Sequence, residues 1–182
     1  MPSYSAPVKD MMFLYEKLRD NKNYNDLERY NEVSSDLVKD ILEEAAKINQ
    51  NLILPLAKAG DENPAILENG VVRTPPGYKE AYQKYIEDGW TSLSCDPKYG
   101  GQGMPKTVSA FFDEMLSSAS LSFKLYSELS IGAYNCINHH ATDEIKDKYL
   151  PKIVEGKWSG TDRKSTRLNS SHSSVSRMPS SA

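Results

Sequence analysis

The sequence predicts a mostly α-helical fold, a helical bundle with one short β-hairpin near Asn69-Gly70. Apolar side chains recur every three or four residues over most of residues 8–154, which is the period of an amphipathic helix. Asn69-Gly70 separates two short apolar runs, and a glycine-rich stretch from Asp88 to Met104 lies between amphipathic segments. A chain of 182 residues is long enough for one domain with a hydrophobic core.

Two amphipathic helices are expected before the hairpin, separated by a polar connector at residues 21–31. Ser34 or Ser35 can cap the second helix. Pro55 is expected to kink or end it, and Gly60 to terminate any remainder. The predicted apolar faces are Val8, Met11, Met12, Tyr15 and Leu18 in the first helix, and Leu37, Ile41, Ala45, Ile48 and Leu52 in the second.

The hairpin is predicted from residues 65–74, because Asn-Gly between apolar runs favours a tight two-residue turn. Two strands alone are marginally stable in water, so the hairpin is expected to lie on the helices. Thr74 is expected to cap the next helix, ahead of Pro75-Pro76. That helix has a tyrosine-rich face made of Tyr78, Ala81, Tyr82, Tyr85 and Ile86.

The glycine-rich stretch is predicted to be an ordered loop. Gly89 reads as the left-handed residue that ends the preceding helix, and Pro105 as the start of the following one. Trp90, Leu93 and Tyr99 can pin the loop to the helices. Two interpretations remain open, a packing element between helix pairs and a functional loop. A phosphate cradle is excluded, because the motif spacing is wrong and no strand precedes it.

Two long helices are predicted after the loop. The apolar face of the first consists of Val108, Phe111, Phe112, Met115 and Leu116. The segment from Leu121 to Asn138 is predicted to be the most buried helix. Gly132 inside it indicates close helix packing or room for a ligand. Thr142 is expected to cap a last short helix, which Gly156 ends.

Residues 162–182 differ from the rest in composition. This segment contains eight serines in 21 residues and few large apolar side chains, so disorder is expected. Back-translated, it resembles a common sequencing adapter, and we interpret it as an assembly artefact. We therefore predict a helical domain with an N-terminal extension at residues 1–161, followed by a disordered serine-rich tail at residues 162–182.

Composition excludes several classes of protein. Charged residues are 26% and the mean hydropathy is −0.60, and no apolar run is long enough for a membrane span. No secretory signal is visible, so a cytoplasmic protein is expected, with Cys95 and Cys136 buried and reduced. The chain carries −3, of which the tail contributes +3, so residues 1–161 carry −6. This acidic balance argues against nucleic-acid binding.

Side chains that could carry chemistry are few. Adjacent residues on a helix point about 100° apart, so one metal ion could not easily bind both His139 and His140. We interpret the two histidines as residues at the C-terminal end of a helix. The acidic pair Asp113-Glu114 is expected to face solvent. No nucleophile and base stand out, and we assign no catalytic, cofactor-binding or metal residue.

Four stretches stand out in order along the chain: PLAKAGD at 55–61, Gly89-Trp90 with DPKYGGQG at 96–103, FDEML at 112–116 and YLPKIVEGKWSGT at 149–161. Together they resemble the N-terminal helical domain of the acyl-CoA dehydrogenases. Residues 1–10 with Met12-Phe13, and the segment 70–78, are similar to the subgroup that contains 3-methylmercaptopropionyl-CoA dehydrogenases. The resemblance covers residues 1–161.

The resemblance implies a flavin-dependent oxidoreductase that acts on the CH–CH bond of an acyl-CoA thioester. It also implies FAD, an electron-transfer partner and a homo-oligomer. The family's β-domain and catalytic glutamate would follow Thr161, so this chain is expected to be inactive and to bind no FAD. The helix from Leu121 to Asn138 corresponds to one lining the far end of the acyl pocket, which makes Leu125, Glu128 and Gly132 substrate-lining candidates. The alternative is a stand-alone helical interaction module.

Overall fold

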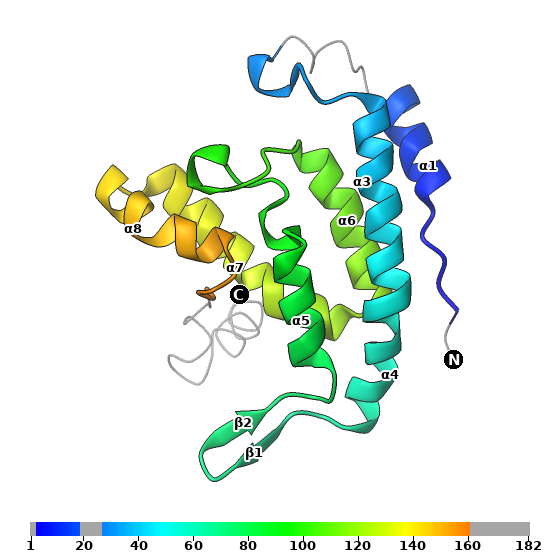
Figure 1. Cartoon of the computed structure of the whole chain (residues 1–182), viewed down its shortest axis with the longest axis vertical. Helices are drawn as coiled ribbons and strands as arrows, with labels where there is room; N and C mark the ends of the chain where they lie inside the picture. The colour runs from blue at the N-terminus through cyan, green and yellow to red at the C-terminus, as the bar shows by residue number, and fades with distance from the viewer. Residues whose placement is uncertain (1–2, 19–26, 161–182) are drawn as a thin grey trace, which may run out of the picture.

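The computed structural model describes residues 3–18 and 27–160 and is mostly helical (Figure 1). The serine-rich segment 162–182, predicted to be disordered, lies outside the described residues. The elements run in the order α1 (Val8–Phe13), η1 (Leu14–Leu18), η2 (Glu28–Tyr30), α3 (Ser35–Ile48), η3 (Asn49–Ile53), α4 (Leu54–Glu62), β1 (Ile66–Glu68), β2 (Val71–Arg73), α5 (Tyr78–Glu87), η4 (Trp90–Ser92), η5 (Pro97–Tyr99), α6 (Lys106–Ala119), α7 (Leu121–His140) and α8 (Asp143–Val154).

The main core lies where α1, α3, α5 and α6 meet. Val38 and Leu42 of α3 and Val108 and Met115 of α6 are all fully buried there. The predicted apolar face of α6 is confirmed, because each of its five residues is buried. A second, smaller cluster joins the glycine-rich loop to α7 and α8 and consists of Cys95, Tyr99, Tyr134, Leu150, Ile153 and Val154.

The predicted face of the second helix is confirmed in part: Ala45 is fully buried, and Ile41, Ile48 and Leu52 are partly buried against the core. Leu37 is 39% exposed, while Val38 and Leu42 are completely buried. A π-helical turn, η3, follows α3 and keeps Asn49 and Ile53 on the same buried side.

Neither Pro55 nor Gly60 ends the helix as predicted. Pro55 lies in the first turn of α4, where a missing N–H is tolerated, and α4 continues to Glu62. Gly60 is inside α4 for a packing reason. A Cβ at Gly60 would lie 2.5 Å from the Tyr78 hydroxyl oxygen, so a side chain at this position would displace the Tyr78 ring.

The hairpin is confirmed, and its predicted position is wrong. Asn69 and Gly70 both have positive φ, at 50° and 78°, and β1 pairs with β2 in antiparallel register. The hairpin does not lie on the helices: all six strand residues are exposed, and it projects from one end of the molecule (Figure 1). Gly77, not Thr74, caps α5, because a left-handed residue is needed where the chain turns back.

The prediction that α7 is the most buried helix is wrong. Its leucines are largely exposed: Leu121 is 57%, Leu125 54% and Leu129 47% exposed. The buried face instead consists of Phe123, Ser127, Ser130 and Tyr134. Small serine side chains let α7 lie close to its neighbours, so the polar residues of this helix face inward and the leucines outward.

Two further expectations were tested by the fold. Cys95 is buried as predicted, but Cys136 is exposed on α7. Among residues 3–18 and 27–160, no helix combines the length and hydropathy that a bilayer span requires.

Candidate functional site

The glycine-rich loop is held together by its own backbone. The N–H groups of Gly101, Gln102 and Gly103 donate to the carbonyl oxygens of Asp96, Ser92 and Cys95 at 2.9–3.0 Å. Gly100 and Gly103 have positive φ, at 90° and 69°. These amides therefore point into the loop, and they are not available to hold a phosphate group.

Gly101 is required by close packing. Its φ is not in the left-handed region, but a Cβ placed there would lie 2.2 Å from the carbonyl carbon and oxygen of Cys95. A side chain of any size would therefore collide with backbone atoms. The loop folds on itself only because this position has no side chain.

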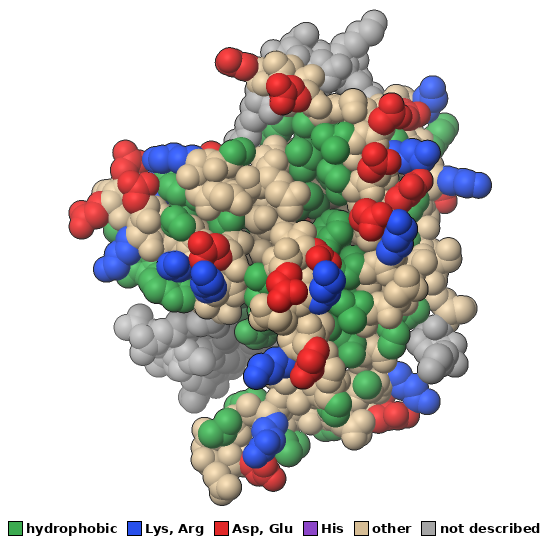
Figure 2. Space-filling model, in the orientation of Figure 1, with side chains coloured by type: hydrophobic (Ala, Val, Ile, Leu, Met, Phe, Trp, Pro, Cys, Tyr) green, Lys and Arg blue, Asp and Glu red, His purple; other side chains and the backbone are tan. Residues whose placement is uncertain are grey.

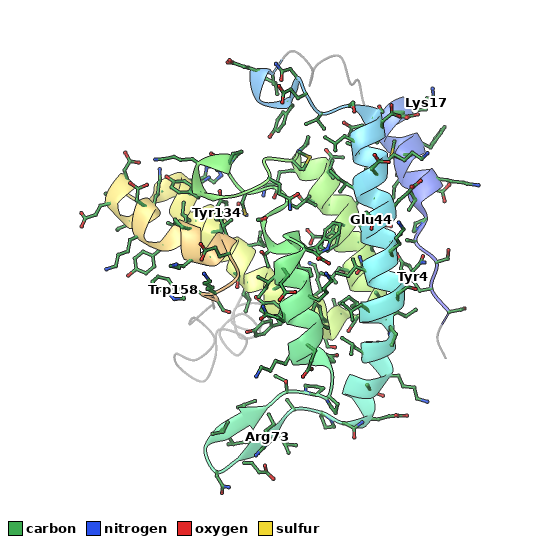
Figure 3. All side chains as sticks on the ribbon, viewed as in Figure 1. Tyr4, Lys17, Glu44, Arg73, Tyr134 and Trp158 are labelled. Carbon is green, nitrogen blue, oxygen red and sulfur yellow. The ribbon has the colours of Figure 1, made fainter. Side chains whose placement is uncertain are left out.

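Three contacts fix the loop to the helices. The Trp90 ring stacks on Phe112 of α6, with ring centroids 4.7 Å apart and nearly parallel planes. The Thr91 hydroxyl donates to the Val154 carbonyl oxygen at 2.9 Å. The Asp96 N–H donates to the Tyr134 hydroxyl at 2.7 Å, and Figure 3 places Tyr134 on α7 beside the loop. The sequence predicted such pinning for Trp90, and the structure confirms it.

A groove of about 440 Å³ lies between this loop, α6 and α7. Aromatic and aliphatic side chains supply part of its lining, and charged or hydroxyl groups supply the rest. Its size is in the range of small-molecule pockets. The lining comes from Tyr85, Trp90, Thr91, Leu93, Ser94, Lys106, Ser109, Ala110, Phe112, Asp113, Ser127, Glu128, Ile131, Gly132 and Asn135.

Charges of both signs surround the groove. The Lys106 ammonium donates to the Ser94 hydroxyl at 2.9 Å. Lys124, whose side chain is only 14% exposed, pairs with Glu128 at 2.8 Å. Asp113 is largely solvent-exposed, yet desolvation of its carboxyl raises its pKa, and nearby Lys124 opposes that rise. The rim is therefore polar and nearly balanced in charge.

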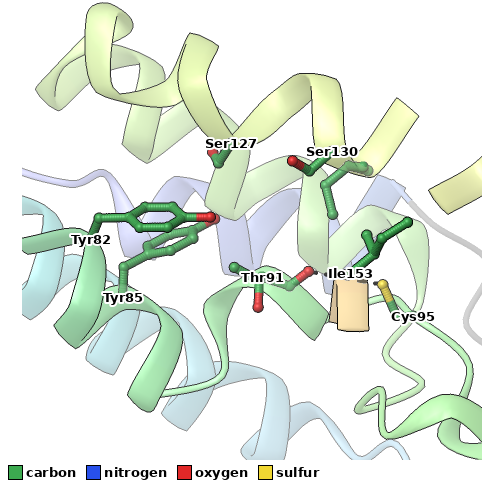
Figure 4. A pocket seen from close by; sticks show the side chains of 8 residues that line it. Tyr82, Tyr85, Thr91, Cys95, Ser127, Ser130 and Ile153 are labelled. Atoms are coloured by element: carbon green, nitrogen blue, oxygen red, sulfur yellow. Dashed lines mark hydrogen bonds between the residues drawn. The ribbon is translucent and has the colours of Figure 1, made fainter. Parts of the chain in front are cut away.

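A much smaller void shares lining residues with the groove, among them Tyr85, Thr91 and Ser127 (Figure 4). It measures about 10 Å³, enough for one water molecule, and Tyr85, Ser127 and Cys95 are among its lining residues. Burial raises the pKa of the Cys95 thiol to about 11. The thiol is therefore protonated at neutral pH and is not an activated nucleophile.

The structure places two of the three predicted substrate-lining residues in the groove. Glu128 and Gly132 lie on its α7 wall, one helical turn apart, and a Cβ at Gly132 would meet nothing within 4 Å. Leu125 is not among the lining residues and is 54% exposed. Sequence reasoning missed Lys106, because nothing in the sequence places α6 opposite α7. Asp113 is exposed, as predicted, and it also contributes to the lining of the groove.

No metal centre is found in residues 3–18 and 27–160, where no three His, Cys, Asp or Glu side chains gather. His139 and His140 lie in the last turn of α7, with ring centroids 6.3 Å apart. A cation there would interact favourably with the helix C-terminus.

The groove does not fit a flavin dinucleotide. The nearby glycine-loop amides are bonded within the loop, and Lys106 is the one cationic side chain in the lining. A dinucleotide carries a pyrophosphate that needs backbone N–H groups or several cations. What the groove can accept is an apolar chain, with polar groups of the rim near its ends.

Comparison with known proteins gives a consistent result. The family model described as acyl-CoA dehydrogenase, N-terminal domain, matches residues 35–157. The chain is 40% identical over 159 residues to the 3-methylmercaptopropionyl-CoA dehydrogenase of Ruegeria pomeroyi, an alignment that covers 87% of this chain and 27% of the relative.

More distant relatives show the same partial coverage. Identity is 28% to a butyryl-CoA dehydrogenase of Syntrophomonas wolfei, over 87% of this chain and 27% of the relative. Identity is 27% to a broad-specificity linear acyl-CoA dehydrogenase of Mycobacterium tuberculosis, over 88% of this chain and 26% of the relative. The chain thus spans about a quarter of the length of the curated relatives it matches.

Proposed function

The chain belongs to the acyl-CoA dehydrogenase family, of which it carries the N-terminal domain, and we propose that it forms one wall of an acyl-CoA pocket in a flavin-dependent dehydrogenase. One observation carries the proposal. The helices matched by the family model enclose a groove that holds Glu128 and Gly132, two of the residues expected to contact the acyl chain.

The proposed role of this wall is binding and orientation. The Trp90 and Phe112 rings and Ile131 offer apolar surface to the distal part of an acyl chain. Glu128, held by Lys124, and Gly132 would lie beside that chain. Leu125 remains a prediction that the groove does not support, since its side chain lies outside the lining.

The whole parent enzyme would oxidise an acyl-CoA substrate with FAD and pass electrons to a partner, as a cytoplasmic homo-oligomer. We propose that the 182-residue chain alone is inactive and that residues 162–182 are an assembly artefact.

Two measurements test this proposal. The purified, desalted chain is expected to show no flavin absorbance and no oxidation of butyryl-CoA with an artificial electron acceptor. A yellow protein, or turnover, would contradict it.

The alternative is a stand-alone helical interaction module. The observation that favours it is that the described residues bury two apolar clusters by themselves. Reading genomic DNA past the codon for Thr161 separates the two. An uninterrupted frame supports the dehydrogenase, whereas a stop codon directly after the serine-rich segment supports the module.

If the frame continues, the groove can be tested in the parent enzyme. Gly132→Phe would fill the groove from α7 and is expected to raise KM for acyl-CoA. Gly132→Ala is the matched control, because its Cβ meets no neighbour. Equal KM values in both variants would remove the groove from the substrate path.

A further inference from the structure

The groove between the glycine-rich loop, α6 and α7 differs in charge between its two ends. Ser120 alone joins α6 to α7. Asp113 and Glu128 line the groove about two helical turns from this joint, and we call this part the inner end. Lys106 lines the groove about two turns farther along α6, where it donates to the Ser94 hydroxyl, and marks the outer end. A chain lying along the groove would therefore meet acidic groups at one end and a basic group at the other.

Lys124 contacts the inner end without lining the groove. Its ammonium pairs with the Glu128 carboxylate at 2.8 Å, and its side chain is only 14% exposed. Desolvation raises the pKa of the Asp113 carboxyl, and the Lys124 ammonium opposes that rise while Glu128 adds to it. One ammonium therefore compensates two carboxylates from different helices. At neutral pH the inner end keeps one uncompensated negative charge.

Charges on the outer surface of α3 and α5 are arranged differently. On the face drawn in Figure 2, acidic and basic side chains are interspersed over these helices. Lys39–Glu43 on α3 and Lys84–Asp88 on α5 are ion pairs of this kind. Exposed pairs are screened by water and salt, so they discriminate weakly between ligands. The uncompensated charge of the inner end lies instead in the wall of a groove.

Apolar side chains line the groove beside the inner end. Phe112 precedes Asp113 on α6, and the Trp90 ring stacks on Phe112. Ile131 lies about one turn from Glu128 on α7. Apolar walls reduce the screening of a nearby charge, so the field of the inner end is stronger there than on an open surface. A carboxylate at the end of a bound chain would be repelled by this field and would also lose hydration, whereas a methyl group would lose neither.

We propose that the inner end determines which acyl chains the groove accepts: it admits chains whose terminal group is neutral and excludes chains that end in a carboxylate. This inference rests on the proposed function and extends it, because it assigns specificity to Asp113 and Glu128 and makes Lys124 a positioning residue. Lys124 is not available to bind a substrate carboxylate, since it pairs with Glu128 and does not line the groove.

Titration of the 182-residue chain with three thioesters of N-acetylcysteamine tests the proposal. The hexanoyl, 6-hydroxyhexanoyl and adipoyl thioesters share one end and differ at the other, which is a methyl, a hydroxyl or a carboxylate. Proton–nitrogen NMR at pH 7 follows the amide signals of Glu128, Ile131 and Gly132. The two neutral thioesters are expected to shift these signals at millimolar concentration. The adipoyl thioester is expected to bind about tenfold more weakly, because its carboxylate meets the uncompensated charge.

Charge variants identify the groups responsible. Asp113→Asn with Glu128→Gln removes both carboxylates and keeps their shape, so the adipoyl thioester is expected to bind at least as well as the hexanoyl thioester. Glu114→Gln is the matched control, because it makes the same change of charge at an adjacent exposed residue that does not line the groove. Lys124→Gln leaves two uncompensated carboxylates and is expected to widen the discrimination, whereas a merely structural lysine would change binding of all three thioesters alike.

The outcomes separate this inference from the proposed function. Equal binding of the three thioesters to the wild type would overturn the charge discrimination and leave the acyl groove in place. A loss of discrimination in Glu114→Gln equal to that in the double variant would also overturn it. If none of the thioesters shifts the groove signals, the groove holds no acyl chain, and both the discrimination and the proposed function fail.

Discussion

Replacing Gly101 with alanine would test the packing on which the glycine-rich loop depends. The added Cβ would lie 2.2 Å from the carbonyl carbon and oxygen of Cys95. These are backbone atoms, and the oxygen accepts the hydrogen bond from the Gly103 N–H, so they cannot move aside without breaking the loop. Overpacking a tight site costs about 1–3 kcal/mol, and with a backbone neighbour we expect the upper end, about 3 kcal/mol.

Thermal unfolding followed by circular dichroism is a suitable assay. A chain of this size loses roughly 2–4 °C of Tm per kcal/mol, so Gly101→Ala is expected to melt about 6–12 °C lower. Gly132→Ala is the matched control: its Cβ meets open space, and replacing glycine inside a helix stabilises by about 1 kcal/mol. Both substitutions replace glycine with alanine, so they lower the conformational entropy of the unfolded chain to the same extent. Gly101→Ala melting within about 2 °C of the wild type would refute the argument that the approach to Cys95 is rigid.

Three further predictions concern single groups. Tyr134→Phe removes the acceptor of the Asp96 N–H and is expected to cost about 1–2 kcal/mol in urea unfolding; an unchanged midpoint would argue against this anchor. Iodoacetamide at about pH 8 is expected to label the exposed Cys136 and to spare Cys95, whose pKa burial raises to about 11; mass spectrometry showing two labels on folded protein would contradict this. Partial desolvation of the exposed Asp113 carboxyl raises its pKa, so the folded state binds this proton more tightly and stability falls as pH rises above about 4; Asp113→Asn should flatten that decline in Tm, and an identical pH profile would speak against it.

Features that depend on local backbone conformation could be predicted from the sequence. The Asn69-Gly70 turn requires two residues with positive φ, and both residue types favour that region. Gly89 ends α5 in the left-handed conformation for the same reason. The α6 face was also predicted correctly, because Val108, Phe112 and Met115 recur at helical spacing between polar residues.

Only some of the residues that line the groove could be predicted from the sequence. Glu128 and Gly132 were found because the segment that contains them resembles a known family. Lys106 gave no such signal, since its position in the groove depends on how the loop and α6 pack against α7. Trp90 lies in a family-like stretch, but from the sequence it was expected only to pin the loop.

Other features were decided by tertiary structure alone. The leucines of α7 have the spacing of a core helix, yet Leu125 is exposed while Ser127 and Ser130 are buried. The sequence shows that α7 is amphipathic in pattern, but burial depends on which neighbours reach each face. Serine side chains are small enough for α7 to approach the loop and α8 closely, and the Gly160 N–H donates to the Ser130 hydroxyl there. Dihedral preferences act within a few residues and can be read from the chain, whereas the choice of buried face is made by contacts between segments far apart in sequence.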